Sequence, residues 1–208
     1  MGHHLDEHLT WEHQINHVHS KLSSGNYAIA RTKNLLPKNI RLTLYNSLFR
    51  SHLEFGILAW GGVSPCRLKS ITNLQKKCVR NVAGKQFRSH TDPLFSSLNI
   101  LKFSDLFDFN CTTFMHKIVL GKQPESFTDM FTSFSGPNRT KNFHTAIPKN
   151  KFLHQFPSFF MPQIWNANSM SIKNIISHNS LKTNVYNAMV QAYNPNVRCR
   201  ERDCPDCR

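Results

Sequence analysis

Apolar residues recur at helical spacing from the start of the chain. The first periodic stretch predicts an amphipathic helix from Trp11 to about Asn34, interrupted at Ser23-Ser24-Gly25. Its opposite face is polar, so we expect one side of this helix to pack on a core. The apolar stripe consists of Trp11, Ile15, Val18, Leu22 and Ile29.

The next stretch, Ile40 to Trp60, is apolar on two sides of a helix. One stripe consists of Ile40, Leu44, Leu48 and Phe55. The other consists of Leu42, Tyr45, Phe49 and Leu53. A helix that is apolar on both sides belongs at the centre of a domain, so we expect both stripes to be buried.

The helix predicted from Pro65 to Gly84 differs because only one of its sides is apolar. Its apolar stripe is Leu68, Ile71, Leu74, Cys78, Val79 and Val82. Its opposite side carries Lys69, Asn73, Lys76, Lys77 and Arg80. Gly84 is the expected C-cap, since glycine readily adopts the left-handed conformation that ends a helix. The pattern predicts a core helix with a basic outer face.

Beyond Gly84 the pattern is helical again, with one loop-rich interruption. It predicts a short helix from Asp92 to Leu98 and a long one from Ser104, as N-cap, to Gly121. Residues 122–163 are rich in turn-forming types, and the segments KNFHTAI and FPSFFMP have the length of two short paired strands. Two helices close the pattern, at residues 169–176 and 180–193. The predicted fold is mainly α, with a smaller α-rich C-terminal extension containing a short β-hairpin.

The excess of basic residues indicates the class of partner that the chain binds. Lys and Arg outnumber Asp and Glu by 26 to 12, which gives a formal net charge of +14 and a pI near 9.8. Such an excess favours an acidic partner, most often nucleic acid. Because Lys69, Lys76, Lys77 and Arg80 share one helix face, they are the predicted phosphate contacts to RNA, DNA or an RNA–DNA hybrid. The plain alternative is a small basic protein that binds nothing specific.

Neither a secretory signal nor a membrane span is expected. The first residues, MGHHLDEHLTW, are polar and acidic where a signal peptide needs an apolar core. The longest apolar run, LEFGILAWGGV, is well short of the roughly 20 residues that cross a bilayer. We therefore expect an intracellular protein, nuclear or cytoplasmic, without a membrane partner.

Cysteine and histidine spacing offers two candidate metal sites. Cys199, Cys204 and Cys207 have spacing compatible with thiolate zinc ligands, but a fourth ligand is missing. Either His178 folds back to supply it, or a residue beyond Arg208 does, or the three thiols stay unpaired. The other cysteines, Cys66, Cys78 and Cys111, sit singly in helical patterns as small core residues. His13 and His17 are four residues apart but lack an accompanying carboxylate, so we expect solvated helix histidines.

No self-contained catalytic constellation is visible in the sequence. Asp105 and Asp108 lie on one helical turn, where two-metal phosphoryl transfer would need clustered carboxylates. Phe103, Phe107 and Phe109 surround them, so the pair is better explained as the polar N-terminal face of a helix. A glycine-rich phosphate loop and a nucleophile elbow are also missing.

Ordered blocks along the chain resemble one known family. LDEHLTW is followed by INHVHSKLSSGNYAIARTKNLLP, LTLYNSLFRSHLEFGILAWGG, RLKSITNLQKKCVRNVAG, HTDPLFSSLNILKFSDLFDFN and finally PQIWN. Together these blocks resemble the region that follows the polymerase palm in reverse transcriptases of non-LTR retrotransposons, of the jockey-like LINE type. The resemblance runs nearly from end to end.

The resemblance implies a division of the chain into four parts. Residues 1–10 would be a remnant of the segment just after the palm, and residues 11–84 a helical thumb that holds the template–primer duplex. Residues 85–193 would be the family's C-terminal extension, with its loop-rich part at 122–163. Residues 194–208 would be a basic, cysteine-containing tail, since the family sometimes ends in a cysteine-rich knuckle.

The sequence also departs from the family pattern. Polymerisation in the family depends on palm aspartates, including an adjacent Asp-Asp pair, and target nicking depends on a separate nuclease domain. This chain has no adjacent Asp pair and neither domain. The leading hypothesis is therefore a non-catalytic fragment of an RNA-directed DNA polymerase that retains nucleic-acid binding. The alternative is a protein-interaction module that uses the basic face and an aromatic-rich patch.

Overall fold

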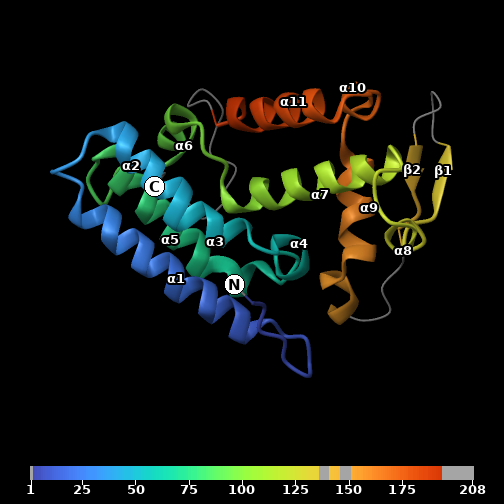
Figure 1. The fold of residues 1–208 in the computed structure, drawn as a ribbon, viewed down its shortest axis with the longest axis horizontal. Coiled ribbons are helices and arrows are strands. Elements are labelled where there is room, and N and C mark those ends of the chain that lie inside the picture. The colour runs from blue at the N-terminus through green and yellow to red at the C-terminus, as the bar shows by residue number, and fades with distance from the viewer. Residues whose placement is uncertain (1, 136–140, 146–150, 194–208) are drawn as a thin grey trace. The chain divides into compact units, whose positions relative to one another are not determined.

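The computed structural model describes residues 2–135, 141–145 and 151–193 of the 208-residue chain. These residues are mainly helical, with one two-stranded antiparallel sheet among them (Figure 1). The prediction of a mainly α fold with a short β-hairpin is confirmed. The chain forms two units. Unit 1 comprises residues 2–56, 65–104 and 189–193, and unit 2 comprises the described residues of Ile57–Ser64 and Asp105–Ala188.

Unit 1 is a bundle built around two long helices, α1 and α5, which pack along each other (Figure 1). A shorter helical run contacts both of them and is π-helical in its middle segment, η1. The elements of unit 1 are α1 (Glu12–Arg31), α2 (Lys38–Leu44), η1 (Tyr45–Arg50), α3 (Ser51–Glu54), α5 (Pro65–Ala83) and α6 (Asp92–Leu98). The predicted helices at 11–34, 65–84 and 92–98 are confirmed.

Gly25 does not interrupt α1, contrary to the expectation for Ser23-Ser24-Gly25. The helix continues through Gly25, which is buried. A Cβ atom added at Gly25 would lie 2.7 Å from the carbonyl oxygen of Leu48 in η1. The absent side chain therefore lets two backbones approach closely, and packing outweighs the low helix propensity of glycine.

The segment from Ile40 to Trp60 is buried on one side only, which corrects the prediction that both stripes are buried. Tyr45, Phe49 and Leu53 are at most 1% exposed. Ile40, Leu48 and Phe55 of the other stripe are 43%, 38% and 36% exposed. Helix α1 contacts η1 and α3, and α5 contacts α2, so these neighbours cover the first stripe. The helix also breaks at Gly56, which has a positive φ of 59°.

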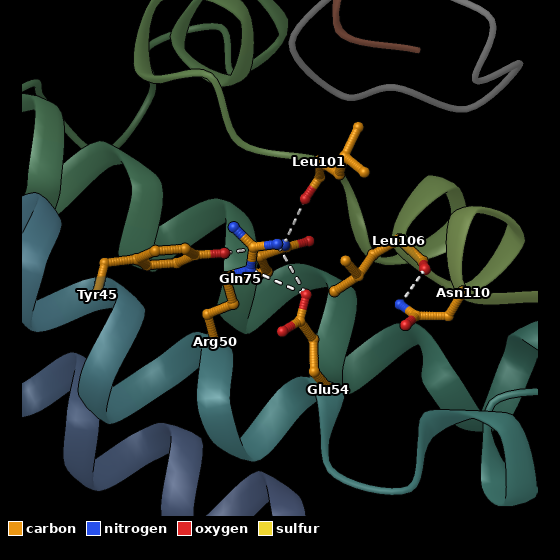
Figure 2. Close-up of polar contacts among 7 residues, drawn as sticks. All are labelled: Tyr45, Arg50, Glu54, Gln75, Leu101, Leu106 and Asn110. Atoms are coloured by element: carbon orange, nitrogen blue, oxygen red, sulfur yellow. Dashed lines mark hydrogen bonds and ion pairs between the residues drawn. The ribbon is translucent and has the colours of Figure 1, made fainter. Parts of the chain in front are cut away.

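A buried glutamine ties α5 to the rest of unit 1 (Figure 2). Gln75 is 1% exposed, and its amide nitrogen donates to the Tyr45 hydroxyl at 3.1 Å and to the Leu101 carbonyl at 2.9 Å. Its amide oxygen accepts the Phe103 backbone N–H at 2.8 Å. These bonds satisfy a polar side chain inside the core and fix the rotation of α5. The basic face of α5 is thereby held outward.

Unit 2 has its own core, which is rich in aromatic side chains. Its elements are α4 (Ile57–Trp60), α7 (Phe103–Val119) from Asp105 onward, α8 (Glu125–Thr128), β1 (Ser133–Ser135), β2 (Lys141–Phe143), the 3₁₀-helix η3 (Lys151–Gln155), α9 (Pro157–Ala167), α10 (Met170–Lys173) and α11 (His178–Gln191) to Ala188. The core consists of Cys111, Met115, Ile118, Phe131, Phe143, Phe159, Phe160, Met161 and Trp165.

The predicted pairing of KNFHTAI with FPSFFMP is wrong. β2 pairs instead with β1, with Phe134 opposite Asn142. FPSFFMP begins helix α9, because Pro157 fits a first helical turn and the following aromatic residues are buried. The Asn166 side chain accepts from the Phe143 N–H at 3.1 Å and donates to its carbonyl at 2.7 Å. A helix side chain thus takes the place of a third strand at the edge of β2.

Within the described part of the chain, no helix has the length and apolar character that crossing a membrane requires.

Candidate functional site

The basic face of α5 owes its position to the burial of the opposite side. Leu68, Ile71 and Val79 are 0% to 7% exposed, so this side is fixed in the core of unit 1. Residues three to four positions apart share a helix face, and the cations fall on the other one. Lys69 and Lys77 are exposed, whereas Lys76 and Arg80 are partly buried. The sorting of charge predicted from the sequence is therefore present on the folded helix.

A pocket of about 700 Å³ opens on this face, entirely within unit 1. Its basic lining residues are Lys76, Lys77, Arg80 and Arg88, and His19 reaches it from α1. The remaining lining residues are Ser70, Asn73, Leu74 and Phe87. Among the described residues no carboxylate lines the pocket, so these residues give it a positive potential and offer hydroxyl and amide hydrogen-bonding groups.

The chain reversal after α5 brings the last lining residues to the pocket. Gly84 has a φ of 72°, and the next N–H, of Lys85, bonds to the Arg80 carbonyl at 2.9 Å. This bond is typical of the Schellman motif that ends a helix at glycine. The Lys33 ammonium donates to the Lys85 carbonyl at 2.8 Å and ties the turn to the segment after α1. The turn is therefore anchored on both sides.

Arg80 connects the helix to this turn. Its Nε donates to the Ser89 carbonyl at 2.8 Å, and its guanidinium carbon lies 5.9 Å from the centre of the Phe87 ring. The latter distance is within the range of a cation–π contact. Phe87 is itself 74% exposed, which is unusual for a phenylalanine. The pocket thus combines fixed cations with an accessible aromatic ring.

Three of the four predicted phosphate contacts meet at this pocket: Lys76, Lys77 and Arg80. Lys69 lies on the same helix, roughly 10 Å further along its axis, and does not line the pocket. Sequence reasoning missed His19, Phe87 and Arg88. The signal for the last two was the run Lys85-Gln86-Phe87-Arg88 directly after a helix-ending glycine, where an aromatic residue between cations has no helical face to bury.

The predicted zinc ligands Cys199, Cys204 and Cys207 lie outside the described residues. Within residues 2–135, 141–145 and 151–193, no group of three or more histidine, cysteine or acidic side chains is placed to hold a metal ion. His13 and His17 are both exposed on α1. Cys78 and Cys111 are buried free thiols, and burial raises the pKa of each above its usual value. The prediction of small core residues is confirmed for these two cysteines and is wrong for Cys66, which is exposed in the first turn of α5.

Unit 2 holds a second cluster of titratable groups, centred on two stacked histidines. His116 is 1% exposed, and its Nε2 lies 2.7 Å from the Ile175 carbonyl, which can only accept. Nε2 therefore carries a proton, and the Nδ1 atoms of His116 and His178 lie 3.2 Å apart in a hydrogen bond in which one donates and the other accepts. Burial lowers the pKa of His178, helped by Lys182 and His116. These bonds join α7 to the segment before α11 and are structural.

Asp108 of α7 is the described carboxyl group with the largest departure from ordinary behaviour. Burial, reinforced by the charge of Asp105, raises its pKa to about 6. The prediction that this pair is simply the polar face of a helix N-terminus did not anticipate that burial. A single, partly buried carboxyl group does not form a metal site, and neither aspartate lines the basic pocket.

Comparison with known proteins yields no relative: no family model, no curated protein and no solved structure matches this chain.

Proposed function

We propose that this chain is a non-catalytic nucleic-acid-binding fragment, descended from the region after the palm of a non-LTR retrotransposon reverse transcriptase. The resemblance of its sequence blocks supports the descent. The observation that carries the binding role is the pocket on α5, whose lining, in the part of the chain that the structure describes, includes four Lys and Arg side chains and no carboxylate.

The geometry of α5 suits a phosphate backbone. Lys69 and Arg80 are eleven residues apart, which corresponds to about 16 Å of helix. A single strand of a duplex presents a phosphate every 3.4 Å or so along the duplex axis but also winds around it, so a straight face of this length meets a few phosphates. The helix is rigid, because its other side is packed in the core. Binding therefore costs little backbone entropy. Such contacts carry affinity without sequence preference.

Titration with a labelled RNA–DNA hybrid tests this role. We expect the four-residue variant Lys69→Gln, Lys76→Gln, Lys77→Gln, Arg80→Gln to bind more weakly than the wild-type chain. The loss should be greatest at low salt, because counterion release drives the interaction. Unchanged affinity across the salt series would contradict the proposal, provided that circular dichroism shows the variant folded.

A second candidate, a protein-interaction module, is favoured by the exposed apolar stripe of unit 1. Ile40, Leu48 and Phe55 are each more than a third exposed on one side of the α2–α3 run. This candidate predicts protein capture that survives nuclease treatment and is lost in Ile40→Ser/Leu48→Ser. The same double variant should leave hybrid binding unchanged, which separates the two candidates.

The chain is not expected to polymerise alone, because the family's palm aspartates have no counterpart in it. A primer-extension assay on the purified chain checks this point. Metal-dependent extension of the primer would contradict the non-catalytic assignment.

A further inference from the structure

Phe87 is not explained by binding to phosphates alone. Its ring is 74% exposed and lines a pocket together with cations, polar groups and the apolar side chain of Leu74. A phosphate backbone has no flat apolar face that could stack on an aromatic ring. A nucleobase does, because every base has a flat face that stacks on aromatic rings irrespective of sequence.

The surroundings of Phe87 strengthen this reading. Arg80 is anchored by its bond to the Ser89 carbonyl and holds its guanidinium 5.9 Å from the ring centre. The contact restrains the ring while leaving most of its surface accessible. The turn that carries Phe87 is fixed by the Gly84 cap and by Lys33. A stacking surface that is already ordered loses little entropy when a base arrives.

We infer that the pocket takes one unpaired nucleotide, whose base stacks on Phe87 while Lys76, Lys77 and Arg80 hold the adjacent phosphates. This inference rests on the proposed nucleic-acid binding and adds to it a preference for ends and single-stranded junctions. Asn73 and Ser70 line the same pocket and offer hydrogen bonds to the base edge or the sugar. The volume of about 700 Å³ falls within the usual range for small-molecule sites.

Three labelled probes test the inference: a blunt RNA–DNA hybrid, the same hybrid with one unpaired nucleotide, and the same overhang made abasic. The abasic probe keeps the phosphate and removes only the base. We expect the wild-type chain to bind the normal overhang about 5- to 150-fold more tightly than the abasic one, the range found for one stacked base. Phe87→Leu, which keeps apolar area but lacks a ring, should bind both overhangs alike.

The blunt hybrid serves as the control probe, because it has no unpaired base to stack on Phe87. Phe87→Leu should bind the blunt hybrid as the wild type does, and Phe87→Tyr should retain the preference for the normal overhang. Because Phe87 is exposed, both variants should unfold at the same urea midpoint as the wild-type chain.

The outcomes separate this inference from the function on which it rests. If removing the α5 cations weakens all probes but Phe87→Leu changes nothing, only the stacking inference is wrong. If removing the cations changes no probe, the nucleic-acid role itself fails. If a polyglutamate peptide displaces the overhang probe as effectively as unlabelled nucleic acid does, the pocket is an acidic-peptide site and the inference is overturned.

Discussion

Helices α5 and α7 are of similar length, but they use their polar residues in opposite ways. On α5 the cations lie on the face away from the core of unit 1 and surround an open pocket. On α7 the polar residues Thr112, Thr113 and His116 are at most 7% exposed and hydrogen-bonded within unit 2. The outward-facing cations Lys76, Lys77 and Arg80 of α5 line a pocket, whereas these three polar residues of α7 form hydrogen bonds that hold unit 2 together.

We therefore expect binding and stability to depend on different sets of residues. Substitutions on the outer face of α5 should change binding with little effect on stability. Substitutions in unit 2, and on the inner side of α5, should change stability with little effect on binding by the folded protein.

The largest effect is expected at Trp165 in the core of unit 2. Its ring is 0% exposed, and its Nε1 donates to the Lys141 carbonyl at 2.9 Å. Trp165→Ala should lower the free energy of unfolding by about 3–5 kcal/mol, because it leaves a large cavity. Urea denaturation measures the loss. The control is Phe87→Ala, which removes an aromatic ring from an exposed site. An equal loss of unfolding free energy in both variants would contradict the expected difference between the core of unit 2 and the outer face of α5.

On α5 itself, the inner side should behave like unit 2. Gln75→Leu keeps a side chain of similar size and removes three buried hydrogen bonds. We expect a loss of about 2–3 kcal/mol, since the Leu101 carbonyl and the Phe103 N–H lose this partner inside the core. The matched control is Asn73→Ala, on the exposed side of the same helix, which should change stability by less than about 0.5 kcal/mol. A comparable loss in both variants would contradict the prediction.

The stability of the folded chain is expected to depend on pH through Asp108 of α7. Its pKa of about 6 in the folded chain is raised above the ordinary value of 3.8. The cost of burying the carboxylate is therefore absent below pH 3.8 and fully present above pH 6. Asp108→Asn should stabilise the chain by on the order of 2 kcal/mol near pH 8 and hardly at all near pH 3.5.

Thermal melts at these two pH values check the Asp108 prediction. Glu125→Gln, which alters an exposed carboxyl group on α8, is the control and should show no such pH dependence. A stabilisation by Asp108→Asn that is equal at both pH values would mean that ionisation is not its cause.

The smallest effect is expected at Gly25. Its substitution by alanine would place a Cβ 2.7 Å from the Leu48 carbonyl oxygen, so the backbones must move apart. The gain in helix propensity, about 1 kcal/mol, offsets part of a packing cost of roughly 1–3 kcal/mol. We expect a net loss of about 1 kcal/mol in chemical denaturation. Ser24→Ala, at an exposed neighbouring position, should be neutral or stabilising; a stabilising Gly25→Ala would contradict the close approach.

Helices with a sustained period could be predicted from the sequence. The stripes of α1 and α5 repeat over several turns, and Gly84 ends α5 at the expected residue. The segment FPSFFMP has no such period, since nearly every residue in it is apolar or proline. Burial in the core of unit 2 then decides its structure as helix, which no local pattern encodes.

The basic face could be predicted for the same reason, because Lys76, Lys77 and Arg80 share a regular helix. Phe87 could not, since its place depends on the turn after Gly84 and not on any periodicity. The exposed stripe of Ile40 and Leu48 was missed because a pattern shows which residues are apolar but not how many neighbours cover them.

The most direct test of the account compares two triple variants that remove the same charge from different places. One is Lys69→Gln/Lys76→Gln/Lys77→Gln on α5, and the other is Lys117→Gln/Lys122→Gln/Lys182→Gln in unit 2. The measurement is the slope of log affinity for an RNA–DNA hybrid against log salt concentration. We expect only the α5 variant to reduce the magnitude of the slope, by about 0.9 for each contact removed. Equal slopes in the two variants would show that net charge alone attracts nucleic acid, and would contradict a binding face on α5.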